Sequence, residues 1–242
     1  MRKQTLSILA VFATLFALSP AQAADYEAPP PLPPAYTWSG FYLGGHLGYG
    51  QANATVNSLP DVGVWGLGTA TLKSDGVLGG GQLGYWFHTD SGFAFGLDAS
   101  LTATDLSKSI ASPVVGTDIW RTSVRTVGLA QGRLGWGNDD WLIFMQGGYG
   151  GVRASARATD PVGLNGSVND SHWHNGWTVG AGLLYRLAPN FSLGAEYSYV
   201  KTQSKLYDWD VPDNISVEVE RARVDHSIHM FKLVGNFHFW AP

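Results

Sequence analysis

Four histidines have the spacing most suggestive of ligand chemistry in this chain. They form two short groups, His172-x-His174 and His226-x-x-His229. Two histidines at i and i+2 of a β-strand point to the same face and could bind a metal or ligate haem at its axial positions. They are therefore candidates for binding hemin. The competing interpretation is that they are solvent-exposed histidines near the ends of long loops and bind nothing. We expect no resident cofactor and no metal.

A second set of polar residues recurs on one side of alternating segments. Its members are His46, Asp98, Arg125, Gln131, Arg133, Glu196 and Lys232. If these segments enclose an interior, each buried charge is tolerable only when it is paired and hydrogen-bonded. The set predicts a polar network that plugs a lumen, with a gated small pore as the alternative.

The sequence contains no convincing motif for an active site or a nucleotide-binding site. Ser227 follows His226 directly, and adjacent residues of a strand point to opposite faces. The run Gly79-Gly-Gly-Gln-Leu-Gly84 fits G-x-G-x-x-G, but an aromatic strand end follows it in place of the helix N-terminus that a pyrophosphate needs. We expect no catalytic residues, no enzyme activity and no nucleotide site.

The elements that must position these residues are segments with period-two alternation. There are eight, at residues 38–54, 76–88, 93–106, 122–136, 141–156, 173–187, 191–203 and 226–240. Tight turns alternate with long connections, which we place at residues 55–75, 107–121, 157–172 and 204–225. Each segment exceeds the ~9–11 residues that a tilted strand needs to cross a bilayer. This predicts an all-β fold, an eight-stranded antiparallel transmembrane β-barrel with short periplasmic turns and long extracellular loops.

One face of these segments is bulky and apolar, and the other is small or polar. Leu97 beside Asp98, and Leu233 beside Lys232, are typical. A soluble eight-stranded barrel would put the apolar set inside, but the bore of eight strands is too narrow for it. The apolar face must therefore meet lipid. The run from Trp141 to Met145 is apolar on both faces, and there we expect Gln146 to point inward.

A short repeat, G-x-L-G-aromatic, occurs three times. The copies are Gly45-His-Leu-Gly-Tyr49, Gly81-Gln-Leu-Gly-Tyr85 and Gly132-Arg-Leu-Gly-Trp136. In each copy the polar residue and the second glycine should point inward, and the leucine and the aromatic outward. Tyr and Trp near strand ends favour the lipid headgroup zone.

The N-terminus has the features of an export signal. Arg2 and Lys3 precede an apolar run, and Ala21-Gln-Ala23 fits a cleavage site between Ala23 and Ala24. We therefore expect a signal peptide at residues 1–23, a Pro-rich periplasmic linker at 24–37 and the barrel domain at 38–242. An uncleaved membrane anchor is the alternative. The chain has no cysteine and a net charge of −4, which argues against disulfides and against nucleic acid as a partner.

The stretch Trp38-Ser-Gly-Phe-Tyr-Leu-Gly-Gly-His-Leu-Gly-Tyr-Gly50 resembles the opening signature of the alphaproteobacterial outer-membrane immunogenic-protein family, small OmpA-like barrels often filed as porin family proteins. Gln131-Gly-Arg-Leu-Gly135 and Leu193-Gly-Ala-Glu-Tyr197 also fit. Family members often have Glu in place of Leu184 and Arg in place of Gly194. If those residues pair in relatives, that part of the network is absent here.

The resemblance implies residence in the cell outer membrane of a Gram-negative envelope. From the plugged barrel we expect a role in envelope integrity and surface display, with a small diffusion porin or a hemin-binding or other ligand-binding receptor as alternatives, and the resemblance favours the hemin alternative slightly. The expected partners are outer-membrane lipids, a host or hemin ligand at the surface loops, and the barrel-assembly machinery. The last of these should read the aromatic-ended strand Lys232–Trp240.

Overall fold

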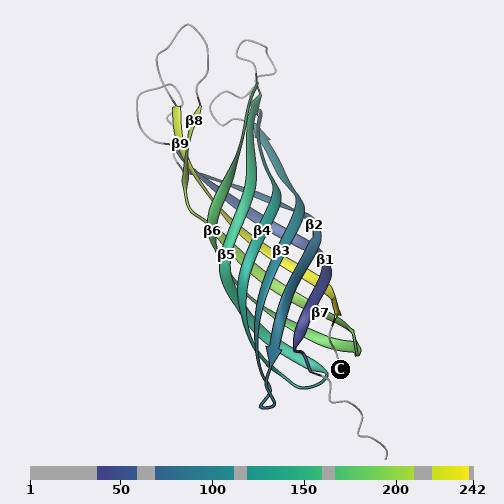
Figure 1. Cartoon of the computed structure of the whole chain (residues 1–242). Helices are drawn as coiled ribbons and strands as arrows, with labels where there is room; N and C mark the ends of the chain where they lie inside the picture. The colour runs from purple at the N-terminus through teal and green to yellow at the C-terminus, as the bar shows by residue number, and fades with distance from the viewer. Residues whose placement is uncertain (1–36, 59–68, 112–118, 160–166, 210–219, 240–242) are drawn as a thin grey trace, which may run out of the picture. The chain divides into compact units, whose positions relative to one another are not determined.

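The computed structural model describes residues 37–58, 69–111, 119–159, 167–209 and 220–239. The strands are β1 Gly40–Ser58, β2 Thr69–His88, β3 Phe93–Ala111, β4 Ile119–Gly137, β5 Trp141–Thr159, β6 Ser167–Ala188, β7 Phe191–Thr202, β8 Lys205–Trp209 and β9 Glu220–His238. The sheet order is β1-β2-β3-β4-β5-β6-β7-β9-β8, and a pairing of β1 with β9 closes it (Figure 1). The short β8 pairs only with the far end of β9, beyond β7. Eight strands therefore form the wall, which confirms the predicted closed antiparallel barrel.

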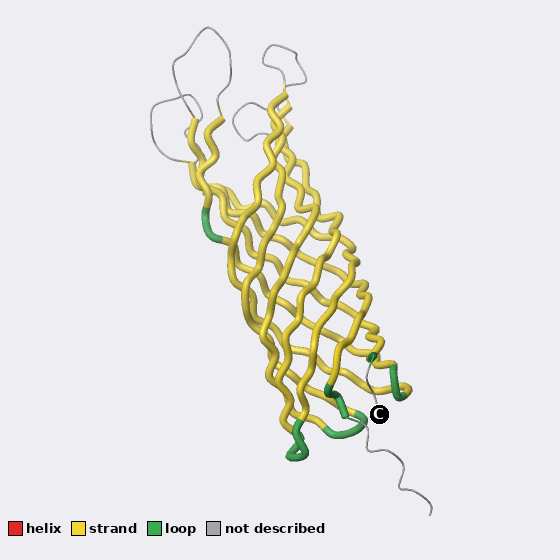
Figure 2. Tube along the Cα trace, viewed as in Figure 1, coloured by secondary structure: helices red, strands yellow, loops and turns green. Residues whose placement is uncertain are grey.

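Three tight turns lie together at one end of the barrel, at residues 89–92, 138–140 and 189–190 (Figure 2). The first turn ends at Gly92, whose φ of 88° is in the region that favours glycine. The C-terminal strand finishes at this same end (Figure 1), which is the periplasmic side of the barrel.

The strands are longer than the alternation predicted. Within the expected loops at residues 55–75, 107–121, 157–172 and 204–225, nearly all described residues are strand, and residues 59–68, 112–118, 160–166 and 210–219 lie outside the described residues. Wall strands reach 22 residues, whereas crossing a bilayer takes ~9–11. Beyond the bilayer neither face needs bulky apolar residues, so the alternation fades there although the hydrogen-bonded ladder continues.

The two faces of the wall are sorted as expected for a barrel in lipid. Leu97 and Leu233 are 71% and 72% exposed, while their neighbours Asp98 and Lys232 are 4% and 3% exposed. Gln146 is also buried in the lumen, the orientation that we expected for β5. A soluble barrel would have the reverse arrangement. None of the described residues belongs to a helix of the length and hydropathy that a membrane span requires.

The start of β1 closes the periplasmic end. Trp38 is fully buried, donates a hydrogen bond from Nε1 to the Asn138 carbonyl (2.7 Å) and packs under the Arg186 guanidinium. The Ser39 hydroxyl oxygen accepts a hydrogen bond from the His88 amide (2.8 Å), which ties β1 to the end of β2. Gly40 has φ 132°, a conformation that other residues rarely adopt. The first three residues of the opening signature thus each have a structural task.

At the extracellular end the ladder divides. The β2–β3 pairing ends at Leu78 and Thr104, and the β6–β7 pairing ends at Gly176 and Thr202. Beyond these points the pairings among the described residues join β8, β9, β1 and β2 on one side, and β3, β4, β5 and β6 on the other. The barrel therefore projects two four-stranded sheets from the membrane.

The predicted signal peptide, its cleavage site between Ala23 and Ala24, and residues 24–36 of the linker lie outside the described residues. These assignments stay predictions.

Candidate functional site: a polar layer inside the barrel

The lumen holds a layer of charged side chains drawn from four wall strands. Asp98 comes from β3, Arg133 from β4, Glu196 from β7 and Lys232 from β9. All four side chains are completely inaccessible to solvent. Two cations and two carboxylates balance each other, so the layer carries no net charge when all four are ionised.

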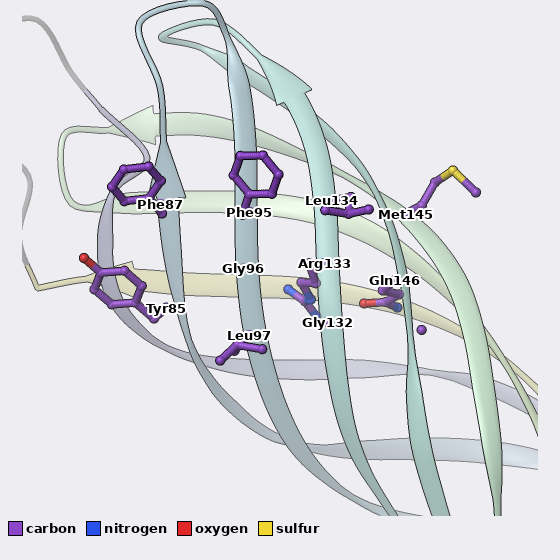
Figure 3. A pocket seen from close by; sticks show the side chains of 11 residues that line it. Tyr85, Phe87, Phe95, Gly96, Leu97, Gly132, Arg133, Leu134, Met145 and Gln146 are labelled. Atoms are coloured by element: carbon purple, nitrogen blue, oxygen red, sulfur yellow. The ribbon is translucent and has the colours of Figure 1, made fainter.

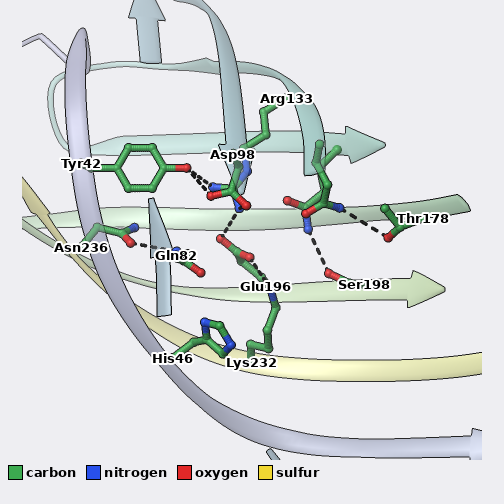
Figure 4. Close-up of polar contacts among 12 residues, drawn as sticks. Tyr42, His46, Gln82, Asp98, Arg133, Thr178, Glu196, Ser198, Lys232 and Asn236 are labelled. Atoms are coloured by element: carbon green, nitrogen blue, oxygen red, sulfur yellow. Dashed lines mark hydrogen bonds and ion pairs between the residues drawn. The ribbon is translucent and has the colours of Figure 1, made fainter. Parts of the chain in front are cut away.

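Arg133 is the centre of this layer (Figure 4). Its Nη2 atom lies 3.2 Å from Asp98 Oδ1 and 3.1 Å from Glu196 Oε1, and its Nη1 donates to the Tyr42 hydroxyl at 3.0 Å. Tyr42 in turn donates to Asp98 Oδ2 at 2.6 Å. The second oxygen of Glu196 lies 3.0 Å from Lys232 Nζ, directly across the β7–β9 ladder. Each charge thus has an opposite charge within hydrogen-bonding distance, as a buried ion requires.

Aromatic rings surround the guanidinium of Arg133. Its central carbon lies 4.8 Å from the Phe144 ring centroid and 5.9 Å from those of Trp86 and Tyr42. A desolvated guanidinium gains from such cation–π contacts. The rings also fill the space beside the ion pairs, so the layer is packed as well as paired.

Amides and hydroxyls complete the layer. Four further side-chain pairs lie in the lumen, namely Gln82–Asn236 at 2.8 Å, His46–Thr102 at 2.9 Å, Gln146–Ser198 at 3.1 Å and Gln131–Thr178 at 3.4 Å. Most are visible around the ion pairs in Figure 4. Each pair joins two wall strands that are separated by one other strand, so the polar layer continues beside the ion pairs.

An apolar cluster covers each side of the polar layer. Towards the periplasm are Trp38, Tyr42, Trp86, Ala94, Leu142, Phe144, Leu184 and Val234. Towards the extracellular side are Ala52, Leu78, Leu106, Val124, Val127, Leu129, Val152, Ala154, Val200, Ile228 and Met230. The lumen is therefore filled by three successive layers, and the charged one has no direct access to water.

Six of the seven residues expected in the lumen are there. His46, Asp98, Gln131, Arg133, Glu196 and Lys232 are each at most 4% exposed.

Arg125 is a correction, because it is exposed on the outside of the barrel. Against β5, the β4 register shifts between Val124 and Thr126, so Arg125 is the extra residue of a β-bulge. This single extra residue reverses the faces, and Val124 takes the inward position instead.

Tyr42 belongs to the network although it was not among the expected residues. Its place on the inward face of β1, two positions from Gly44, was the signal that could have identified it.

At the departures from the family pattern, Leu184 lies directly opposite Gly194. A Cβ on Gly194 would lie 2.6 Å from Leu184 Cδ2. Leu184 packed against Gly194 thus takes the place of the Glu and Arg that family members often have at these two positions.

The three G-x-L-G-aromatic copies place their side chains alike. The polar residues His46, Gln82 and Arg133 are all buried in the lumen layer. The leucines and the terminal aromatics are all exposed on the outer wall. The repeat is thus a wall unit that delivers one polar side chain to the lumen from each of β1, β2 and β4.

Two of the four candidate histidines, His174 and His226, are in contact. The rings of His174 and His226 lie edge to face with centroids 5.0 Å apart, at the extracellular end of the lumen. His172 is exposed. His229 points away from His226 and makes a 2.8 Å hydrogen bond with the Tyr197 hydroxyl. The four therefore do not form one ligand set, and no group of three or more metal-ligating side chains occurs within the described ranges.

The paired histidines lie beyond the apolar band. Outward-facing residues beside them are Trp173, of a type that favours the headgroup zone, and the charged Arg153, Lys201 and Asp225, of which the last two form an ion pair. Burial lowers the pKa of His174 to about 4, with a smaller contribution from the positive charge of Lys205. Burial, and then the neighbouring His174, lower the pKa of His226 to about 4. Both rings are therefore neutral at pH 7.

Comparison with known proteins agrees with this architecture. The sequence model described as "Outer membrane protein beta-barrel domain" matches residues 8–221. The chain is 29% identical over 205 residues to the 31 kDa outer-membrane immunogenic protein of Brucella melitensis, covering 79% of this chain and 85% of that protein. It is also 29% identical over 182 residues to a 22 kDa outer membrane protein of Rhizobium leguminosarum, covering 74% and 72%.

Among solved structures, the outer membrane protease OmpT of Escherichia coli is similar with a TM-score of 0.51 and 11% identity, covering 85% of this chain and 98% of that one. At this identity the likeness shows the fold alone. Together with the closed barrel and its apolar outer band, the family match places the protein in the outer membrane. The chain belongs to the outer membrane protein β-barrel domain family.

Proposed function

We propose that this protein is a closed outer-membrane barrel that contributes to envelope integrity and displays two β-sheets at the cell surface. The observation that carries the proposal is the complete burial of the Arg133, Glu196 and Lys232 side chains across the bore. The interior of an eight-stranded barrel has room for side chains but not for an open channel. Apolar layers on both sides of the ions make the seal stronger against water and ions.

The surface-display part of the proposal is supported by the two sheets beyond the membrane. On β1 and β5 the strands continue for several residues past Tyr49 and Tyr149, which are the last exposed aromatic residues of those two strands. The Brucella relative is named an immunogenic protein, which fits a protein with exposed extracellular parts. A host or other ligand would meet these sheets first.

We further propose that the protein is not an enzyme. His226 points into the lumen and Ser227 points outward, so the two cannot act on one bond. The buried carboxylates Asp98 and Glu196 are both engaged by Arg133 and have no direct access to a substrate. A hemin receptor built on the four histidines would need residues from different faces of the wall.

Assembly is proposed to use the last strand. Phe237 and Phe239 are exposed at the periplasmic end of the barrel. An aromatic-ended final strand of this kind suits recognition by the barrel-assembly machinery.

Solute flux tests the closed-barrel proposal. Liposomes that contain the purified protein should swell in isotonic solutions of small sugars no faster than protein-free liposomes. A general porin reconstituted in parallel is the positive control. Swelling that increases with the amount of this protein would contradict the proposal.

A further inference from the structure

A groove of about 680 Å³ lies on the outer wall of the barrel, across β2, β3, β4 and β5 (Figure 3). Two ladder rows form it. One is Phe87, Phe95, Leu134 and Met145, and the next is Tyr85, Leu97, Gly132 and Gly147. Four adjacent strands span about 14 Å at ~4.8 Å per strand. The groove is thus long, shallow and bounded on one side by a full row of bulky apolar side chains.

The lining of the groove is apolar. Arg133 and Gln146 reach it only from within the wall, because their side chains are 1% and 5% exposed and take part in the lumen layer. The side chains that face outward are aliphatic, aromatic or absent. An occupant of this groove therefore has to be a hydrocarbon.

The floor is made of glycines that the fold does not require. A Cβ on Gly132 would come no closer than 3.9 Å to any neighbouring atom, and one on Gly147 no closer than 3.5 Å. By contrast, a Cβ on the adjacent inward residue Gly148 would lie 2.2 Å from the Ala130 carbonyl oxygen. Larger residues at Gly132 and Gly147 would fit the wall and would fill the groove.

The position of the groove on the barrel wall indicates which hydrocarbon could occupy it. It is continuous with the lipid-facing band, and Phe87 and Phe95 lie next to the periplasmic turn at residues 89–92. The periplasmic leaflet of an outer membrane consists of phospholipid. We propose that the groove between Met145 and Tyr85 holds one acyl chain of a phospholipid from the periplasmic leaflet. This site is separate from the lumen and does not depend on whether the lumen is closed.

Lipid retention tests the site. Wild-type protein, transferred from phosphatidylethanolamine-containing micelles into lipid-free detergent, should keep one phospholipid in native mass spectra. Gly132→Leu/Gly147→Leu should lower the lipid-bound fraction at least several-fold. Gly45→Leu/Gly81→Leu is the matched control, because this outward pair is also directly opposed and has its nearest atoms at 3.8 and 3.6 Å. Equal retention by both variants, or no retention by the wild type, would overturn the proposal.

A second measurement on the wild type does not depend on any variant. Met145 borders the groove, and Met230 is fully buried in the lumen, so methyl-¹³C methionine gives one reporter for each place. Titration of phosphatidylethanolamine into detergent micelles should shift the Met145 methyl signal saturably and leave that of Met230 unchanged. A linear response, or none, would overturn the site. Concentration-dependent dimers that Gly132→Leu/Gly147→Leu abolishes would instead assign the groove to a second copy of this chain and would also overturn it.

Discussion

Arg133 Nη2 and Glu196 Oε1 lie 3.1 Å apart at the centre of the barrel, and neither side chain is accessible to solvent. They join β4 to β7, which are not neighbours in the sheet. The pair therefore braces the barrel across its bore, where the ladder hydrogen bonds act only around the wall. It also places two desolvated charges where an open channel would need water.

Removal of Arg133 should therefore destabilise the barrel strongly. Arg133→Ala leaves Asp98 and Glu196 buried with fewer partners, at a cost of about 3–5 kcal/mol in the free energy of unfolding. Urea unfolding in lipid vesicles, followed by tryptophan fluorescence, measures this. Arg125→Ala is the matched control, since Arg125 is exposed on the same strand, and should change stability by no more than about 0.5 kcal/mol. Equal effects of the two variants would contradict the role of the network.

A charge on the lipid-facing band should be equally harmful for a different reason. Leu97→Arg puts a cation into hydrocarbon and should cost ~2–4 kcal/mol if the position is near the bilayer midplane. Thr71→Arg, on an exposed strand residue beyond the apolar band, should cost ~0–1 kcal/mol. The same unfolding assay compares them, and normal stability of Leu97→Arg would refute the placement of the membrane.

Inward and outward glycines should respond oppositely to a methyl group. A Cβ on Gly48 would lie 2.0 Å from the Phe231 carbonyl oxygen, whereas one on Gly45 meets nothing within 3.8 Å. Gly48→Ala should therefore displace β1 from β9 and cost about 1–3 kcal/mol. Gly45→Ala should be neutral or slightly stabilising. The temperature at which the heat-modifiable band shifts in detergent gels distinguishes the two, and a tolerated Gly48→Ala would show that the bore is looser than described.

Acid should weaken the extracellular end of the barrel. The pKa values of His174 and His226 are lowered to about 4, from an ordinary value near 6.5. As the pH falls below 6.5 the unfolded chain takes up these protons first, so stability is lost between about pH 6.5 and pH 4. The charged groups that act on the two rings are His172, Lys201, Lys205 and Asp225.

Urea midpoints at pH 7, 5.5 and 4 measure this loss. His174→Gln/His226→Gln should flatten the dependence over that window, while His172→Gln, at an exposed position, should leave it unchanged. A wild-type midpoint that does not fall with pH, or an equally steep fall in the double variant, would contradict the assignment.

The wall and the lumen-facing charges could be predicted from the sequence because every residue of a strand has one of two faces. The prediction was wrong at Arg125, because a β-bulge adds one residue to the strand there and shifts the in-and-out alternation. Nothing in the sequence pattern indicates this bulge. The apolar layers were also missed. Buried Leu142 and Phe144 stand beside exposed Ile143 and Met145, and hydropathy cannot separate a lipid-facing residue from one that fills the lumen. The alternation did not reveal the strand extensions of β1 to β6, because polar residues occupy both faces there, whereas a hairpin beyond the membrane before the last strand was expected and β8 pairs with β9 there.

The central claim is that the barrel is closed, and planar-bilayer recording tests it most directly. Purified wild-type protein, shown to be folded by its heat-modifiable migration, should insert without stepwise conductance. Arg133→Ala, which removes the centre of the polar layer, is the informative comparison, because it reports whether that layer controls any leak that does occur. Silent bilayers with the wild type are the result that the closed barrel predicts. Reproducible wild-type steps that change in size with Arg133→Ala would show a conducting lumen and contradict it.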